Sequence, residues 1–129
     1  MGSVWTLEAP LSVPQSKKKN FILNLNVYRN AHYQTLNTVK KRYKEAMTAQ
    51  IVSLPKLDKI SITYTLYPKT RRLCDISNIL AVHDIFFCDA LQELDKLEDD
   101  NYLYLPSVNY RMGEIDKENP KVIIEIQET

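Results

Sequence analysis

The sequence predicts an α+β fold: a single domain spanning residues 1–129, in which two main helices pack against one mostly antiparallel β-sheet. Three observations support this prediction. A chain of 129 residues suits one domain with a sizeable core. Apolar residues make up 44% of the chain and only two residues are glycine, which argues against disorder or low complexity. Two long helical patterns also lie among short segments that are typical of strands.

The N-terminal 20 residues predict an additional strand followed by a basic loop. The stretch SVWTLEAPL alternates loosely between apolar and polar residues, and Pro10 and Pro14 close it. The stretch QSKKKN, which follows, is predicted to be the basic loop. The next stretch, FILNL, is short, apolar and alternating, which predicts a second strand over residues 21–25.

The first main helix is predicted over residues 30–52 or 32–52, before Pro55. Its apolar residues recur at steps of three and four: Leu36, Val39, Tyr43, Ala46, Met47 and Ile51. This pattern leaves Lys40 and Lys41 largely on the solvent side of the helix.

The clearest strand is KISITYTLYP, which has a period of two and several β-branched residues. A second main helix is predicted from Ile76 to about Leu94. Because its apolar residues lie on several sides, we expect this helix to be deeply buried or to pack against a partner subunit. After a turn at KLEDDN, two further strands are predicted in YLYLPSVNYRM and PKVIIEI, joined by the polar loop GEIDKENP.

The two halves of the chain carry opposite charge, although the net charge is only +1. Residues 17–72 contain 13 Lys and Arg against two acidic residues, a balance of +11. Residues 75–129 contain 4 Lys and Arg against 13 acidic residues, a balance of −9. Such asymmetry is typical of a polyanion-binding surface beside an acidic one. A solvated surface with scattered charge is the alternative interpretation.

Other features of the sequence predict the cellular location of the protein and the state of its cysteines. No apolar run reaches the roughly 18–20 residues that a membrane-spanning helix needs. The N-terminus lacks the pattern of a secretory signal, so a cytoplasmic location is expected. Cys74 and Cys88 are too few for a zinc site or a disulfide framework and are predicted to be two buried free thiols.

Five aspartates in the acidic half are candidate catalytic residues: Asp75, Asp84, Asp89, Asp99 and Asp100. They come from the end of a strand connection, a helix and the next turn, so their carboxylates could converge on one cleft. Such oxygen ligands suit Mg²⁺, or Mn²⁺ as a substitute. A metal held there could activate water for in-line displacement at phosphorus. Arg71 and Arg72 would then hold the phosphates of the cleaved strand.

The same residues also have purely structural interpretations. Asp75 could cap the second main helix, and Asp99 and Asp100 could be ordinary turn residues. His83 stands alone on a mostly apolar helix, and a packed or surface histidine explains it better than a ligand or a base.

Three stretches carry a resemblance to a known family: KTRRLCDISN, CDALQEL and KLEDDNYL. Together they resemble the RusA family of Holliday-junction resolvases, small endonucleases common in phages and prophages. That family carries a basic run into an Asp-x-Asp-Asn motif, then a helix with Asp-Ala-Leu, then an Asp-Asp pair. With the flanking strands and the first main helix, the resemblance covers residues 21–126.

The resemblance implies a homodimeric, Mg²⁺-dependent endodeoxyribonuclease that resolves four-way DNA junctions by paired nicks, in recombination and repair. The cell would be a bacterium or a phage-infected host. Asp75 matches the first aspartate of the family motif, and Asp89 matches the aspartate of Asp-Ala-Leu. Asp99 and Asp100 match the pair. We therefore predict Asp75 and Asp100 as metal ligands, with the other two as further or supporting acids.

The chain departs from the family pattern at two positions. Ser77 replaces the second aspartate of the motif, and Ala81 replaces a lysine one helical turn later. Asp84 lies seven residues after Ser77 and would share its helix face, so we hypothesise that Asp84 supplies the missing carboxylate as a metal ligand. The missing lysine could be replaced by Lys69, Lys96 or Lys40.

The basic half is expected to supply the DNA contacts. The predicted residues are Arg71, Arg72, Lys69, Arg29, Lys40 and Lys41. Tyr28, His32 and Tyr33 could contact the unstacked centre of a junction, although both tyrosines could equally belong to the core. An alternative function is a structure-selective junction binder whose catalysis is weakened or lost because Ser77 is a poor metal ligand. A small structural or protein-interaction module is a third class.

Overall fold

The computed structural model describes residues 2–129. Its elements follow in the order β1 (Val4–Ala9), β2 (Ser12–Ser16), β3 (Lys19–Ile22), α1 (Leu25–Asn30), α2 (Tyr33–Val52), β4 (Ile60–Tyr67), α3 (Ile76–Glu93), β5 (Ser107–Met112) and β6 (Lys121–Glu128). The predicted α+β class with a mostly antiparallel sheet is confirmed.

A four-stranded sheet in the order β1-β6-β4-β5 forms one layer of the molecule. Strand β6 pairs antiparallel with β1 and β4, whereas β5 pairs parallel with β4. The register places Tyr64 of β4 between Ile124 of β6 and Tyr110 of β5. In β6, buried residues alternate with half-buried ones, which fixes this register because a slip of one residue would turn the apolar side chains to solvent.

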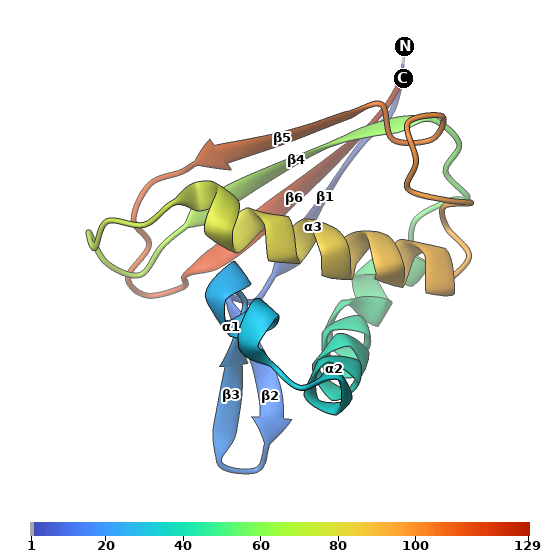
Figure 1. Ribbon diagram of the computed structural model, residues 1–129. Coiled ribbons are helices and arrows are strands. Elements are labelled where there is room, and N and C mark those ends of the chain that lie inside the picture. Colours follow the sequence, from blue (N-terminus) through green and yellow to red (C-terminus); the bar gives the residue numbers. More distant parts are fainter. Residues whose placement is uncertain (1) are drawn as a thin grey trace.

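The helices lie on one face of this sheet (Figure 1). Helix α3 crosses the sheet, while α2, α1 and the antiparallel β2–β3 hairpin lie on the far side of α3 from β5. The bend between α1 and α2 falls at Ala31 and His32, both in extended backbone conformations. The hairpin and α1 therefore stand apart from the sheet and form a corner with the start of α2.

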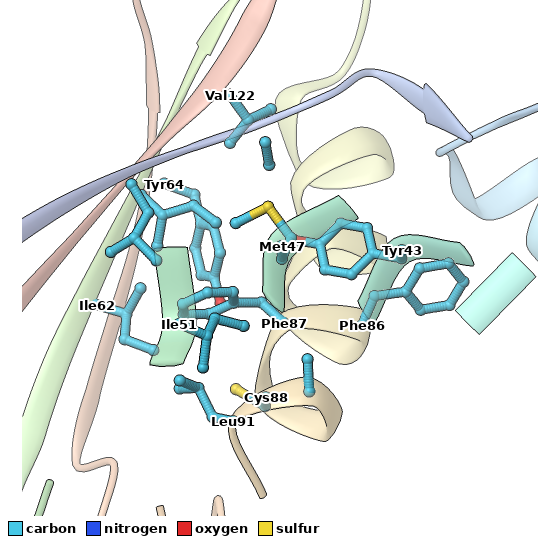
Figure 2. Packing of buried hydrophobic residues seen from close by; sticks show 14 of the residues in the cluster. Tyr43, Met47, Ile51, Ile62, Tyr64, Phe86, Phe87, Cys88, Leu91 and Val122 are labelled. Carbon is cyan, nitrogen blue, oxygen red and sulfur yellow. The ribbon is translucent and has the colours of Figure 1, made fainter. Parts of the chain in front are cut away.

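The core fills the space between the sheet and the two long helices (Figure 2). Helix α2 contributes Tyr43, Met47 and Ile51 to it, all fully buried. The ring of Tyr43 meets the edge of the Phe86 ring from α3 at a centroid distance of 5.6 Å, and Tyr64 meets Phe87 at 6.3 Å. Each large apolar side chain buried here stabilises the fold by roughly 2 kcal/mol.

The N-terminal segment differs from the sequence prediction. Residues 15–20, expected to be a loop, form the turn and flanking strands of the β2–β3 hairpin. The strand expected over residues 21–25 ends at Ile22, because Asn24 begins α1: its side-chain oxygen accepts a hydrogen bond of 2.8 Å from the backbone N–H of Val27. Such capping satisfies a donor at the helix start and stops the extended conformation.

The remaining elements follow the prediction closely. Helices α2 and α3 begin and end within one or two residues of the expected positions. Strand β5 is shorter than expected, since residues 102–106 are irregular before Ser107. Cys74 and Cys88 are both free thiols; Cys88 is buried, as predicted, but Cys74 is exposed, because it lies in the loop before α3. In the part of the chain that the structure describes, no helix combines the length and apolar character needed to cross a membrane.

Candidate functional site

The start of α3 and the preceding loop form a cavity of about 600 Å³. The predicted phosphate-binding residues Arg71 and Arg72 line this cavity together with Asp75 and Ser77. All four side chains are exposed. The structure therefore brings the basic run and the first aspartate of the motif together, as the sequence suggested.

Asp75 occupies the N-cap position of α3, but its side chain makes no capping hydrogen bond. Only its backbone oxygen takes part, accepting the N–H of Asn78 at 3.0 Å. Asp75 therefore lies at the capping position, but capping does not account for its carboxylate, which makes no hydrogen bond to the helix. Its exposed carboxylate is available to a ligand in the cavity.

A second group of predicted acids lies at the other end of α3. Asp89 is near the end of the helix, and Asp99 and Asp100 are in the following loop. The pKa of the Asp100 carboxyl is raised, first by desolvation and then by its hydrogen bond with Asp99 and the like charges of Asp99 and Asp89. The charges of Asp99 and Asp89 therefore disfavour ionisation of Asp100, an effect that a nearby cation would offset.

Asp99 also has the structural role expected of a turn residue. Its two carboxylate oxygens accept the backbone N–H of Asp100 at 2.7 Å and the side-chain amide of Asn101 at 2.9 Å. Asp100 is the more exposed of the two acids. Asp100 is therefore better placed than Asp99 to bind a ligand.

Asp84 is held by the protein itself. One of its carboxylate oxygens accepts a hydrogen bond from the hydroxyl of Tyr64 at 2.9 Å and one from the thiol of Cys88 at 3.4 Å. Burial, with the nearby Asp84 charge as a smaller cause, raises the pKa of both the Tyr64 hydroxyl and the Cys88 thiol. Both donors therefore keep their protons, which secures these hydrogen bonds.

The geometry of α3 separates the predicted acids along its axis. With a rise of about 1.5 Å per residue, Ser77 and Asp84 are about 10 Å apart along the axis. By the same measure Asp75 and Asp89 are about 21 Å apart. The structure thus does not bring Asp84 to the position of Ser77, and it does not bring Asp75 together with Asp89, Asp99 or Asp100. Within residues 2–129, no group of three or more His, Cys, Asp or Glu side chains is arranged to hold a metal ion.

The three lysines proposed to replace the family lysine have different surroundings. Lys40 forms an ion pair of 3.3 Å with Asp89, one of the predicted acids. Lys96 donates to the backbone oxygen of Leu54 at 2.6 Å, which is a structural role. Lys69 is exposed in the loop before Arg71. Lys40 is thus the lysine that lies beside a candidate carboxylate.

Part of the opposite charge of the two halves is neutralised by ion pairs within the fold. Ion pairs connect the basic half to the acidic half: Lys40–Asp89, Lys44–Glu93, Lys56–Asp95 and Lys56–Glu98. Such partly exposed pairs contribute little to stability, typically below about 1 kcal/mol each. They do reduce the positive charge that is available to a polyanion. Arg29, Lys41, Arg71 and Arg72 remain exposed, with no ion pair among the described residues.

The aromatic residues near the start of α2 divide into two kinds. Tyr28 is half-buried and packs against Phe86 at a centroid distance of 6.0 Å, so it belongs to the core. His32 and Tyr33 are exposed, and their rings lie 4.6 Å apart at 31°. His32 also caps α2, since its Nδ1 accepts the N–H of Gln34 at 3.1 Å.

Sequence reasoning missed a cleft of about 580 Å³ between the hairpin and the corner of α1 and α2. A signal for it was present, because residues 9–44 contain no Asp or Glu. His83, in contrast, is fully buried, which agrees with the prediction of a packed histidine.

A scan against protein-family models found no match to this chain, and a search of curated proteins found no significant similarity.

Proposed function

We propose that this protein is a metal-dependent endodeoxyribonuclease that resolves four-way DNA junctions in recombination and repair, as its resemblance to the RusA family implies. The observation that supports this most directly is the placement of Asp89 at the end of α3 and of Asp99 and Asp100 in the loop that follows, where the charges of Asp99 and Asp89 help to raise the pKa of Asp100. Repelling carboxylates beside an exposed turn favour a divalent cation such as Mg²⁺ or Mn²⁺. Lys40 forms an ion pair with Asp89 and is thereby held beside one of these carboxylates.

The cavity at the N-terminal end of α3 supports the DNA-binding part of the proposal. Arg71 and Arg72 are exposed there and present guanidinium groups that suit DNA phosphates. When a metal is bound, it would activate water and stabilise charge at phosphorus. The residues of the chain would bind and orient the strand, with Asp75 able to hold a further ligand in the cavity.

A homodimer gives the two separated groups a way to act together. Along one α3 they are about 21 Å apart. Two α3 helices that pack antiparallel across a twofold axis would bring the Asp75 end of one copy beside the Asp100 end of the other. Ala81 and Ile85 of α3 are partly exposed, so part of their apolar surface is accessible to such packing, although Ile85 also packs against the core.

The experiment is to incubate the protein with a synthetic four-way junction and either Mg²⁺ or Mn²⁺. We expect paired nicks that need the metal, and a loss of at least about a hundredfold in rate for Asp100→Asn or Asp75→Asn. Asp95→Asn is the matched control: Asp95 is exposed, pairs with Lys56, and has a positive φ of 59° that asparagine tolerates. Full activity in both Asp75→Asn and Asp100→Asn would contradict the proposal.

A second candidate is a junction-binding protein without nuclease activity. Two observations favour it: Ser77 stands where the family has an aspartate, and residues 2–129 form no ready metal-binding group. Retained junction binding with no cleavage in either metal would favour this candidate over the nuclease.

A further inference from the structure

We propose that the cleft between the β2–β3 hairpin and the α1–α2 corner binds an unpaired stretch of DNA. The inference rests on the proposed action on branched DNA and assigns it a second contact surface, which we call the hairpin cleft. Its polar lining consists of Gln15, Asn20, Asn26, Asn30, His32 and Thr35, with Lys19 beside them. Its volume, about 580 Å³, is in the range of sites that bury one small ligand or one base with its sugar.

The charge around the hairpin cleft favours a polyanion. Residues 9–44 contain eight Lys and Arg and no acidic residue. Three consecutive residues at the turn of the hairpin, Lys17, Lys18 and Lys19, are exposed. They form no ion pair with any of the described residues. Unlike Lys40 and Lys44, these lysines form no ion pair with the acidic residues of α3. They stand where the hairpin projects from the body of the molecule (Figure 1).

The lining of the hairpin cleft matches the edges of bases rather than phosphates alone. Asn20 and Asn26 are exposed, and within residues 2–129 their side-chain amides make no hydrogen bond. Each amide offers N–H donors and an acceptor oxygen, which can complement the mixture of acceptors and donors on the Watson–Crick edge of a base. Phe21, Val27 and Ala31 add an apolar part to the same lining. Bases present these edges only when they are unpaired.

An aromatic surface lies at the rim of the hairpin cleft. His32 lines the cleft, and the ring of Tyr33 stacks against it at 4.6 Å. Tyr33 keeps 65% of its surface exposed, which the core interpretation does not explain. Exposed rings beside a basic groove are the usual means of binding single strands, because every base can stack on them. A four-way junction that opens at its centre would supply such unpaired bases.

The test measures binding without metal, in EDTA, so that it does not depend on cleavage. The probes are a fluorescent oligothymidylate and a duplex of equal length. We expect Tyr33→Ala and Asn26→Asp each to weaken oligothymidylate binding about fivefold or more, with little effect on the duplex. We expect the triple variant Lys17→Ala, Lys18→Ala and Lys19→Ala to lower the slope of log affinity against log salt by about 2, since a single strand gives about 0.7 per phosphate contact.

The matched control is Asn109→Asp, which makes the same charge change on the exposed strand β5, outside the hairpin cleft. Thermal melting of each variant checks that the fold is retained. Oligothymidylate binding as tight in Tyr33→Ala and Asn26→Asp as in the unmodified protein would overturn the inference. An equal loss for oligothymidylate and duplex would also overturn it, because it would mean a general basic surface. If either of these results is found while metal-dependent nicking is retained, the proposed nuclease function stands and only the proposed binding role of the hairpin cleft is rejected.

Discussion

At the residue scale, His83 and Tyr43 place three polar atoms in the core without hydrogen-bond partners: both ring nitrogens of His83 and the hydroxyl of Tyr43. Their rings meet edge to face at 6.2 Å. Burial lowers the pKa of His83 to about 3, so the folded protein keeps this imidazole neutral at ordinary pH. The unpartnered atoms cost stability at every pH, and His83 adds a further cost when the solution becomes acidic.

We expect His83→Leu to make the protein less sensitive to acid. Below about pH 6.5 the unfolded chain protonates His83 while the folded chain does not until about pH 3. The free energy of unfolding therefore falls as pH drops through this window, by up to about 1.4 kcal/mol per pH unit from this residue. Urea unfolding at a series of pH values from 7 to 4 measures the slope. His32→Asn is the control, because it removes the other histidine while keeping a side-chain oxygen that can cap α2. An unchanged slope in His83→Leu would show that His83 is not responsible.

At the element scale, the first turn of α3 lacks an acidic residue, and its N-cap side chain makes no hydrogen bond. The helix is held mainly by the packing of residues such as Phe86 and Phe87 against the sheet and α2. The N-terminal end of α3 is thus weakly stabilised by local interactions, at the point where the basic cavity is formed.

We expect Ser77→Asp to stabilise the protein by roughly 0.5 kcal/mol, because a carboxylate in the first turn interacts favourably with the helix dipole. It would also supply the aspartate that the RusA pattern has at this position, so under the proposed function metal-dependent nicking should rise severalfold. Ser77→Asn serves as the comparison, with similar size and no charge. A gain in melting temperature without a gain in nicking would place the metal away from this end of α3.

At the scale of the whole molecule, a mixing experiment tests whether two copies complete each site. Asp75→Asn and Asp100→Asn are each expected to be inactive in nicking. In a mixed dimer with sites shared between copies, one of the two sites would have both aspartates intact. We therefore expect the mixture to recover up to about a quarter of the original activity, because about half of the dimers are mixed. No recovery, with subunit exchange verified by a tagged copy, would show that each site lies within one chain.

The sequence predicted the parts of this molecule that depend on apolar periodicity. Helices α2 and α3 and strand β4 were found because residues such as Val39, Tyr43 and Met47 repeat at the spacing of a buried face. The hairpin was missed because three lysines and Pro14 weaken the strand pattern, while Val13 and Phe21 alone anchor it in the core.

The candidate site was predicted only in part. The sequence brought Arg71, Arg72 and Asp75 together correctly, since they are neighbours along the chain. It did not foresee that Tyr64 would hold Asp84, because that contact joins a strand to a helix 20 residues later. The separation of Asp75 from Asp89 was available from the helix rise alone.

The parallel pairing of β5 with β4 has a mechanical consequence. Helix α3 and the acidic loop together form the crossover that carries the chain from β4 to β5. Strand β5 is at an edge and is held by one neighbour only, and edge strands detach at lower free energy than central ones. The N-terminal end of α3, next to Arg71 and Arg72, follows the central strand β4. The C-terminal end leads through the loop with Asp99 and Asp100 into the edge strand β5. Detachment of β5 would thus disturb the loop that carries Asp99 and Asp100, and it would also open the cavity of Arg71 and Arg72, because Met112 of β5 lines that cavity.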